Sequence, residues 1–174
     1  MLANIVNSPS TRGLIAKTNR NGGRLPHKIA ILYTDAKKEY FSTLEEFYTV
    51  DRSDEEARDF GPFFKSLGVE VCYILGDANM TKNLLREKPD MAINLVTTVK
   101  GYDSLGATVP STLELLEIPY TGAATLGFAL GCNKYLIYAL LSQHGIPVPR
   151  FQLLTSANSV LDPSLRFPLI LKLN

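Results

Sequence analysis

The stretch "KIAILYT", residues 28–34, decides the fold class of this chain. It is a short run of aliphatic, β-branched and aromatic residues, without the polar alternation of a half-exposed strand, and it therefore predicts a strand buried on both faces. Two later runs have the same character, "VEVCYIL" at 69–75 and "MAINLVTT" at 91–98. Strands that are apolar throughout are typical of a parallel sheet with both faces covered.

Helical patterns separate these predicted strands. Ser53, with Glu56 three residues later, matches a capping box and predicts a helix that runs to about Leu67 and stops at Gly68. A second helix is predicted over 80–88 and a third from about Pro110, after a glycine-containing loop at 100–108. This alternation predicts an α/β fold, a Rossmann-like parallel sheet with helices on both faces.

The stretch between strand 28–34 and the first helix has no clear pattern. "EYFSTLEEFY" fits either a short amphipathic helix or an inserted loop, and both alternatives stay open. Further along, "IPYTG" at 118–122 predicts a short strand that exits through Gly122. A helical stretch follows that breaks near 131–132, and Asn133 is the expected N-cap of the next helix.

The amino-acid composition changes after residue 146, where prolines and a "TSANS" stretch indicate a linker. We therefore predict a flexible leader at 1–27, one domain at 28–146, and a linker with a further strand at 147–174. That strand is "FPLILKLN", an apolar run opened by proline. The leader carries four basic residues and no acid, and with Lys28 the segment 1–28 has a charge of +5, whereas residues 29–60 hold nine acids against four bases.

Composition excludes several classes of protein. The chain has 174 residues, 45% of them hydrophobic and 20% charged, and its net charge of +1 gives no overall basic field for nucleic acid. No run approaches the roughly 18 apolar residues of a membrane span. Cys72 and Cys132 are too few for a disulfide framework and read as buried thiols in a reducing cytoplasm. Two isolated histidines, His27 and His144, read as surface residues and offer no zinc site.

Ligands of open parallel sheets bind beyond the carboxyl ends of the strands. That rule selects four segments: Thr34–Ala36, Gly76–Asp77, Thr97–Thr98 and Tyr120–Gly122. No dinucleotide fingerprint, P-loop or nucleophile elbow accompanies them. Three aspartates, Asp35, Asp77 and Asp103, are placed to approach this rim, although ordinary solvated loop carboxylates explain them more simply.

Two lysines stand in positions that a nearby anion would explain. Lys134 falls in the first turn of a helix, where a cation opposes the helix dipole. Lys172 follows directly on the apolar run 169–171, and burying a cation is costly unless an anion meets it. The alternative, an amine that reaches into solvent, stays open for Lys134 on these grounds.

The order of motifs in the second half resembles a known family. "LLEIPYTGAATLGFALGCNK", then "GIPVPRF" and "FPLILKLN", are similar to the N-terminal part of ATP-grasp ligases of the D-alanine–D-alanine ligase type. The resemblance implies a pre-ATP-grasp domain at 28–146 and the first strand of a truncated ATP-grasp domain at 147–174. It implies that Lys134 and Lys172 lie against nucleotide phosphates, with Tyr120, Thr121 and Gly122 on the substrate side.

The same resemblance implies a reaction. ATP activates a carboxylate as an acyl phosphate, an amine attacks it, and ADP and phosphate are released. ATP and Mg²⁺ are the implied cofactors of the complete cytoplasmic enzyme, and small-molecule carboxylates and amines are its partners. A third, weaker hypothesis makes the domain a platform for a homodimer. The glycine-rich phosphate loop and the metal ligands of the family do not occur in these 174 residues, so we expect no metal site and no ligase activity from this segment by itself.

Two departures from the family pattern bear on the substrate: "YTDAKKEYF" lacks the glycine-rich turn with glutamate, and the H-G-x-x-G-E-D-G loop is represented only by "TTVKGYDSLGA". Asn133 in place of an aspartate, and Leu173 and Asn174 in place of proline and its successor, are tolerable departures. A substrate other than D-alanine is therefore the safer expectation. The hypothesis from another class is a non-catalytic Rossmann-like module that binds a ligand or a partner protein.

Overall fold

A computed structural model describes residues 25–49 and 53–172. The strands are β1 (Lys28–Tyr33), β2 (Glu70–Leu75) and β3 (Met91–Asn94). The helices are η1 (Lys38–Tyr40), α3 (Leu44–Tyr48), α4 (Ser53–Ser66), α5 (Met80–Glu87), η2 (Asp103–Ala107), α6 (Thr108–Leu115), α7 (Thr125–Gly131) and α8 (Lys134–Gln143). All but residues 25–27 of the predicted leader lie outside the described residues.

The three strands form one parallel sheet in the order β2-β1-β3. In the register, Ala30 of β1 lies between Cys72 and Ala92. A single parallel bridge from Ala92 to Tyr120 extends the sheet by one position beyond β3. The predicted α/β class with a parallel sheet is confirmed, and the predicted strand at 118–122 is reduced to this one bridge.

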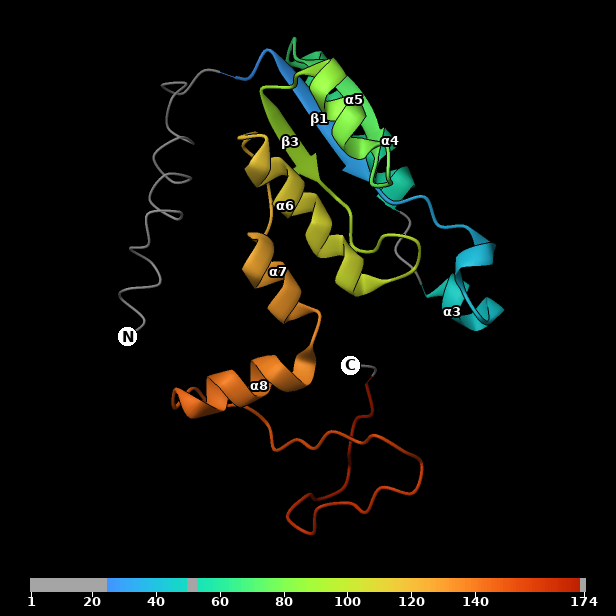
Figure 1. Ribbon diagram of the computed structural model, residues 1–174, viewed down its shortest axis with the longest axis vertical. Helices are drawn as coiled ribbons and strands as arrows, with labels where there is room; N and C mark the ends of the chain where they lie inside the picture. Colours follow the sequence, from blue (N-terminus) through green and yellow to red (C-terminus); the bar gives the residue numbers. More distant parts are fainter. Residues whose placement is uncertain (1–24, 50–52, 173–174) are drawn as a thin grey trace.

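Helices cover both faces of the sheet, as predicted (Figure 1). On one face, the side chains of Leu32 and Ile74 pack with Leu84 of α5 and Leu113 of α6. On the other face, Ile29 and Ile31 pack with residues of α4, among them Ala57 and Phe64. Residues 29–32 of the central strand are at most 1% exposed, so β1 is the buried core of the domain.

Strand β3 is shorter than the predicted run of 91–98. After Asn94 the side-chain carbonyl of that residue accepts a hydrogen bond from the Val96 N–H at 3.1 Å. An asparagine side chain that bonds the backbone two residues later replaces a ladder bond with a turn. The remaining residues to Thr98 therefore form a connection in which Val96 and Thr98 are buried and Thr97 is exposed.

The first residues of helix α4 differ from the prediction in their hydrogen bonding. Ser53 begins the helix, but its Oγ accepts the N–H of Thr34 at 2.7 Å, and both residues are buried. The complete capping box of the described residues is instead at Thr43 and Glu46, at the start of α3. For "EYFSTLEEFY", where a short helix and an inserted loop were both open, the structure therefore contains the short helix α3.

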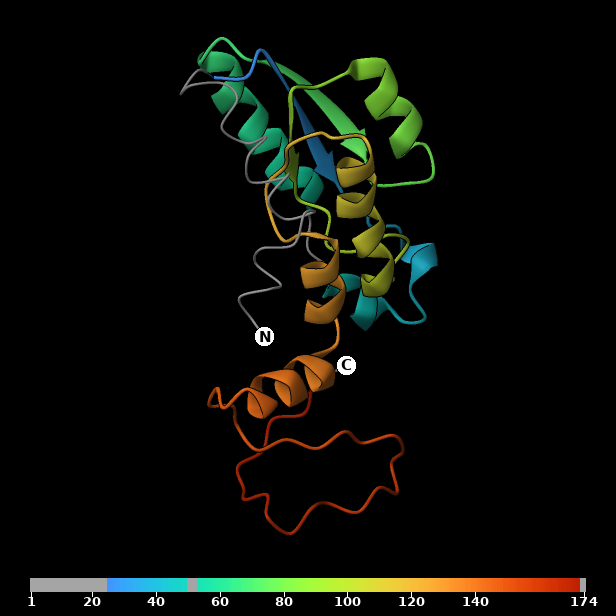
Figure 2. The same ribbon diagram turned by 60° about the vertical axis from the view of Figure 1, so that its left-hand side comes forward.

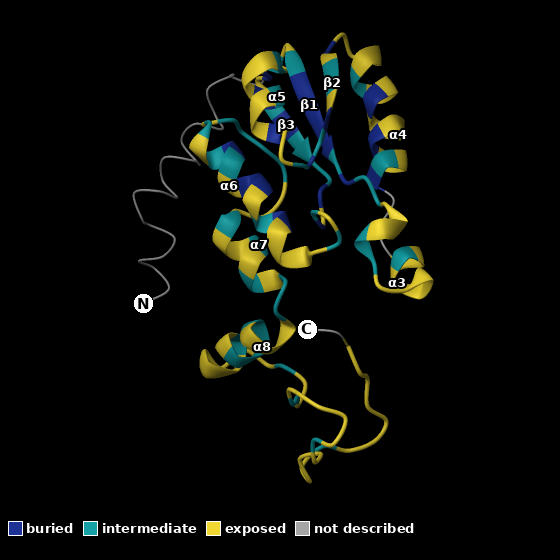
Figure 3. Cartoon of the chain, turned by 45° about the vertical axis from the view of Figure 1, so that its right-hand side comes forward, coloured by how far each residue is buried: buried dark blue, intermediate teal, exposed yellow. Residues whose placement is uncertain are grey.

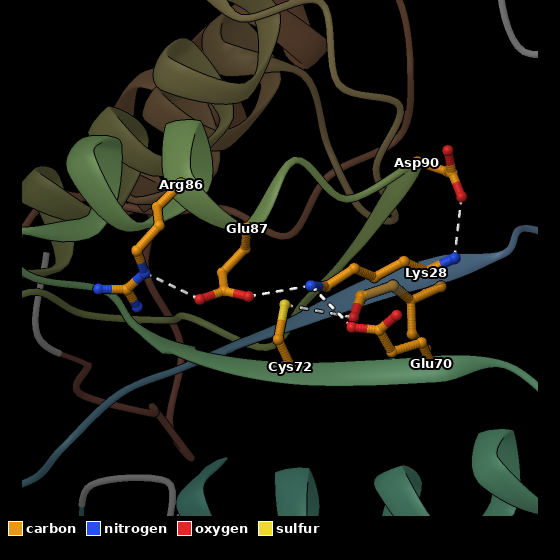
Figure 4. Close-up of polar contacts among 7 residues, drawn as sticks. Lys28, Glu70, Cys72, Arg86, Glu87 and Asp90 are labelled. Atoms are coloured by element: carbon orange, nitrogen blue, oxygen red, sulfur yellow. Dashed lines mark hydrogen bonds and ion pairs between the residues drawn. The ribbon is translucent and has the colours of Figure 1, made fainter.

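The amino edge of the sheet is tied together by charges (Figure 4). The Lys28 ammonium lies 2.8 Å from a carboxylate oxygen of Glu70, its register partner on β2, and 2.9 Å from one of Glu87 at the end of α5. The Lys28 N–H also donates to Asp90 Oδ2 at 2.8 Å. Hydrogen bonds from Lys28, to Glu70 first and then to Glu87, hold the pKa of its ammonium above the ordinary value.

The C-terminal part of the chain extends away from the sheet. Figures 1 and 2 show α8 and the segment 147–172 below α7, and Figure 3 shows that this segment is mostly exposed. Phe151 anchors it to α8 through edge-to-face ring contacts with Tyr135 and Tyr138. Residues 167–172 form no strand, because a strand requires a neighbour to complete its hydrogen bonds and none lies beside them within the described part.

None of the helices within residues 25–49 and 53–172 is long and apolar enough to cross a bilayer. Both histidines are exposed, as predicted, and His144 is the C-cap residue of α8. Cys72 and Cys132 are free thiols and are only half-buried. Burial is the main cause that raises the pKa of each thiol above its usual value.

We expect Lys28→Gln to lower the free energy of unfolding at pH 7, since it removes the cation shared by Glu70 and Glu87. A pKa raised in the folded state stabilises the fold below the unfolded value of 10.5, and this contribution is lost as pH rises further. The difference between wild type and variant should therefore shrink above about pH 10.5 in urea titrations. Lys82→Gln, on an exposed position of α5, is the matched control; an equal loss in that variant would contradict the role of Lys28.

We expect Gly106→Ala in η2 to destabilise the domain. An added Cβ would lie 2.7 Å from ring carbons of Phe128 and 2.8 Å from the carbonyl oxygen of Thr97. Overpacking of this kind costs about 1–3 kcal/mol. Gly131→Ala in α7 is the control, because nothing lies within 4 Å of its added Cβ; thermal unfolding should show a loss in the first variant and none in the second.

Candidate functional site

The ends of β1 and β3 are joined by buried hydroxyl groups. Thr34 follows β1, and its Oγ1 donates to the carbonyl oxygen of Thr98 at 3.0 Å while its N–H donates to Ser53. Thr34 is 5% and Thr98 9% exposed. The hydroxyl oxygen of Thr98 has no hydrogen-bond partner. At the carboxyl end of the sheet, the polar groups of Thr34 are thus satisfied by Ser53 and Thr98, whereas the Thr98 hydroxyl is left without a partner.

A tight turn lies beside these threonines. Val99 and Tyr102 exchange backbone hydrogen bonds of 3.2 and 3.1 Å, and the two residues between them, Lys100 and Gly101, both have positive φ. Positive φ at both central positions is the mark of a type I′ hairpin turn. An added Cβ on Gly101 would lie 2.8 Å from the Tyr40 carbonyl oxygen, so η1 lies directly against this turn.

The three predicted rim aspartates do not act as a group. Asp77 accepts the Asn79 N–H at 2.8 Å and shapes the turn into α5. Asp35 forms an ion pair with Lys37 at 3.5 Å, and Asp103 begins η2. In the described ranges 25–49 and 53–172, no group of three or more histidine, cysteine or acidic side chains could hold a metal ion. The reading of these aspartates as loop carboxylates fits their surroundings.

The predicted substrate-side residues Tyr120 and Thr121 belong to a polar network. Thr121 Oγ1 accepts the Asn94 N–H at 3.1 Å, which ties this segment to the end of β3. The Tyr120 hydroxyl donates to Glu114 Oε1 at 2.6 Å. Gly122 has a φ of +106°, a conformation that a residue with a Cβ rarely adopts, and it turns the chain toward α7.

Glu114 is the centre of that network. Its carboxylate also accepts the Thr125 N–H at 2.9 Å and the Thr125 hydroxyl at 2.9 Å. Burial acts to raise the pKa of Glu114, but the hydrogen bonds from Tyr120 and Thr125 together outweigh it and leave that pKa lowered. Burial, and then the bond to Glu114, raises the pKa of the Tyr120 hydroxyl well above its usual value.

Lys134 is the first residue of α8 and is exposed. The predicted N-cap of this helix is confirmed, since Asn133 Oδ1 accepts the Leu136 N–H at 2.8 Å. Lys172 is exposed as well, and the segment that ends with it returns toward the N-terminal end of α8 in Figures 1, 2 and 3. The C-terminal segment with Lys172 thus approaches the end of α8 where Lys134 lies. The contact of these two lysines with phosphate stays a prediction.

Two features of this region were not predicted from the sequence. One is the linkage of Thr34, Ser53 and Thr98, which lie far apart along the chain. The other is Glu114, whose only signal was an acid inside the apolar run "LELL" of the predicted helix. An acid on the inner side of a helix requires hydrogen-bond donors, and a search for such an acid would have selected it.

The comparisons with known proteins support the resemblance seen in the sequence. No family model matches the chain. It is 34% identical over 110 residues to the D-alanine–D-alanine ligase of Azorhizobium caulinodans, a match that takes in 63% of this chain and 35% of that ligase. It is 46% identical over 65 residues to the ligase of Halorhodospira halophila, with 37% and 21% covered. The predicted similarity to these ligases is confirmed.

A third relative, D-alanine–D-alanine ligase B of Pseudomonas putida, is 36% identical over 107 residues, which cover 60% of this chain and 33% of that enzyme. The chain thus matches about a third of the length of two of these relatives and a fifth of the other. Among solved structures, the ligase from Bacillus anthracis complexed with ATP aligns with 22% identity and a TM-score of 0.47, covering 79% of this chain and 43% of that one.

We expect Glu114→Gln to lower the free energy of unfolding at pH 7 by about 1–3 kcal/mol, because hydrogen bonds to a charged acceptor become bonds to a neutral one. A pKa lowered in the folded state stabilises the fold above the unfolded value of 4.5, and this contribution disappears as pH falls through the folded value. Urea titrations from pH 7 to pH 3 should therefore show the two proteins converging in acid. A constant difference at all pH values would rule out the carboxylate charge as the cause.

Proposed function

We propose that this chain is the N-terminal part of an ATP-dependent ligase of the D-alanine–D-alanine ligase type, which joins a carboxylate to an amine through an acyl phosphate and releases ADP. The observation that carries the proposal is the 34–46% sequence identity to three such ligases. The parallel sheet with polar groups at its carboxyl edge supports it, since that edge is where open α/β sheets bind ligands.

In this proposal the chain supplies one wall of the reaction site. Tyr120, Thr121 and Gly122 lie on the substrate side, held by Glu114 and by the end of β3. The hydroxyl groups of Tyr120 and Thr121 bond to Glu114 and to the Asn94 N–H. In the proposal these two residues therefore form the surface of the wall. The carboxylate substrate attacks the terminal phosphorus of ATP, ADP leaves, and the amine then displaces phosphate from the acyl carbon.

The ammonium groups of Lys134 and Lys172 supply charge for the phosphates. A lysine acts as a compact point charge, and such a charge stabilises the negative charge that develops during phosphoryl transfer. Both side chains are exposed in the described chain, so each is accessible to a nucleotide. The described residues do not fit a magnesium site, and we derive no step through a metal.

The substrate is proposed to be a carboxylate other than D-alanine, joined to an amine in the cytoplasm. The strand exit after β1 carries Thr34 and Asp35 in place of a glycine-rich turn with glutamate. The exit after β3 carries a tight turn with Lys100 and Gly101 in place of the loop with histidine and glutamate. Both changes alter the size and the charge of the carboxyl edge, where the first substrate would lie.

The test is an assay of the complete protein encoded with this segment. With ATP and a panel of amino acids, including D-alanine, the complete protein should release ADP in proportion to product, and residues 1–174 alone should release none. Absence of amino-acid-dependent ADP release with the complete protein would refute the proposal and favour the non-catalytic module.

We expect Lys134→Ala and Lys172→Ala each to weaken ATP binding by the complete protein by about tenfold or more, because a hydrogen bond to a charged group contributes about 1.5–3 kcal/mol. Isothermal calorimetry measures the affinity directly. Lys65→Ala at the end of α4 is the matched control, since that lysine lies over the Tyr73 ring on the opposite face of the sheet from α5 and α6. Unchanged affinity in both variants would show that neither lysine contacts the nucleotide.

A further inference from the structure

Helix α7 is short and has no buried residue to fix its position in the fold. It has only seven residues, none of them buried, and its N-cap residue Ala124 offers no side-chain hydrogen bond. Isolated helices shorter than about 12–15 residues are marginal in water. The place of α7 must therefore be fixed by contacts that other elements make with it.

The strongest of these contacts is the carboxylate of Glu114, which comes from α6. It accepts both the N–H and the hydroxyl of Thr125, the first residue of α7, at 2.9 Å each. The Thr125 N–H is one of the backbone donors that a helix leaves without a partner at its N-terminus. Glu114 therefore does for α7 what a local N-cap residue does elsewhere, and its negative charge favours the positive end of the helix.

Two weaker contacts guide the rest of α7. The Phe128 ring lies against Gly106 of η2, where an added Cβ would come within 2.7 Å of it. At the far end, the Cys132 thiol is 3.5 Å from the carbonyl oxygen of Asp103. Neither contact is charged, so the Glu114 carboxylate supplies the only charge-assisted anchor of α7 among the contacts described for residues 25–49 and 53–172.

The end of α7 determines where α8 begins. Only Cys132 and Asn133 separate the two helices, and the Asn133 N–H still bonds back to the Leu130 carbonyl at 3.1 Å. Asn133 then caps α8, whose first residue is Lys134. A displacement of α7 is thus transmitted to the Lys134 backbone without a flexible linker to absorb it.

We propose that Glu114 is a positioning residue for Lys134: by holding Thr125 it fixes α7, and through α7 it sets the place of the Lys134 ammonium. The inference rests on the proposed function, because it gives the position of Lys134 a consequence for nucleotide binding. Glu114 itself does not touch the nucleotide. Its carboxylate is occupied by Tyr120 and Thr125.

Hydrogen exchange tests the structural half of the proposal without any ligand. In Glu114→Ala, amides of α7 and of the first turn of α8 should exchange about tenfold faster or more, the change that a loss of about 1.4 kcal/mol produces. Amides of β1 should keep their protection. Thr125→Val should give a smaller increase in the same amides, since it removes the hydroxyl bond but keeps the N–H bond to Glu114, and Thr125→Ser should restore protection. Loss of protection spread over β1 as well would show a general structural role and overturn the proposal.

A double-mutant cycle on ATP affinity of the complete protein tests the other half. If Glu114 acts through Lys134, Glu114→Ala weakens ATP binding in the wild type but adds nothing in a Lys134→Ala background. Glu87→Ala, which removes a carboxylate from the distant Lys28 network, is the control for loss of stability and should leave ATP affinity unaltered.

The outcomes separate this inference from the proposed function. Additive losses in the cycle, or an unchanged affinity in Glu114→Ala while Lys134→Ala weakens binding, overturn the positioning role and leave the ligase proposal in place. Failure of the wild-type protein to bind ATP or to release ADP overturns the ligase proposal and the nucleotide half of the inference, while the exchange experiment still decides whether Glu114 holds α7.

Discussion

The burial of β1 between two parallel neighbours is the constraint on which the rest of the structure depends. Residues 29–32 are almost fully buried and lie in register with both β2 and β3. A parallel neighbour on each side requires crossover connections, so helices must cover the two faces and every strand must end at the same edge. The candidate site at the carboxyl edge is a direct consequence of this arrangement.

Different kinds of polar contact hold the two ends of the sheet. At the amino edge, Lys28 draws Glu70 and Glu87 together and closes the sheet against α5. At the carboxyl edge, an uncharged hydrogen bond from the Thr34 N–H to the Ser53 hydroxyl joins the end of β1 to α4. In the proposed function, the cations that meet the phosphates come from later in the chain, above all from α8.

Distance from the sheet explains why those cations depend on a chain of contacts. The helices α5 and α6 are fixed by apolar burial against β1, whereas α7 has no buried residue and is held by the Glu114 carboxylate. Hydrophobic burial is non-directional, while a carboxylate with two hydrogen bonds to one residue fixes direction as well as place. The proposed alignment of Lys134 with a phosphate would require the second kind of contact.

The sequence by itself determined the fold class, because apolar strands and helix periodicity are local signals that residues 28–34, 69–75 and 91–98 carry openly. It also indicated Asn133 as a cap and the similarity to the ligases. Only the tertiary structure decided that the Ser53 hydroxyl accepts the Thr34 N–H, and that the Glu114 carboxylate accepts the Thr125 N–H of α7. The physical reason is that such a side chain can bond either to nearby backbone or to a group that is distant in sequence. Which bond forms depends on the donor that the folded chain places within reach.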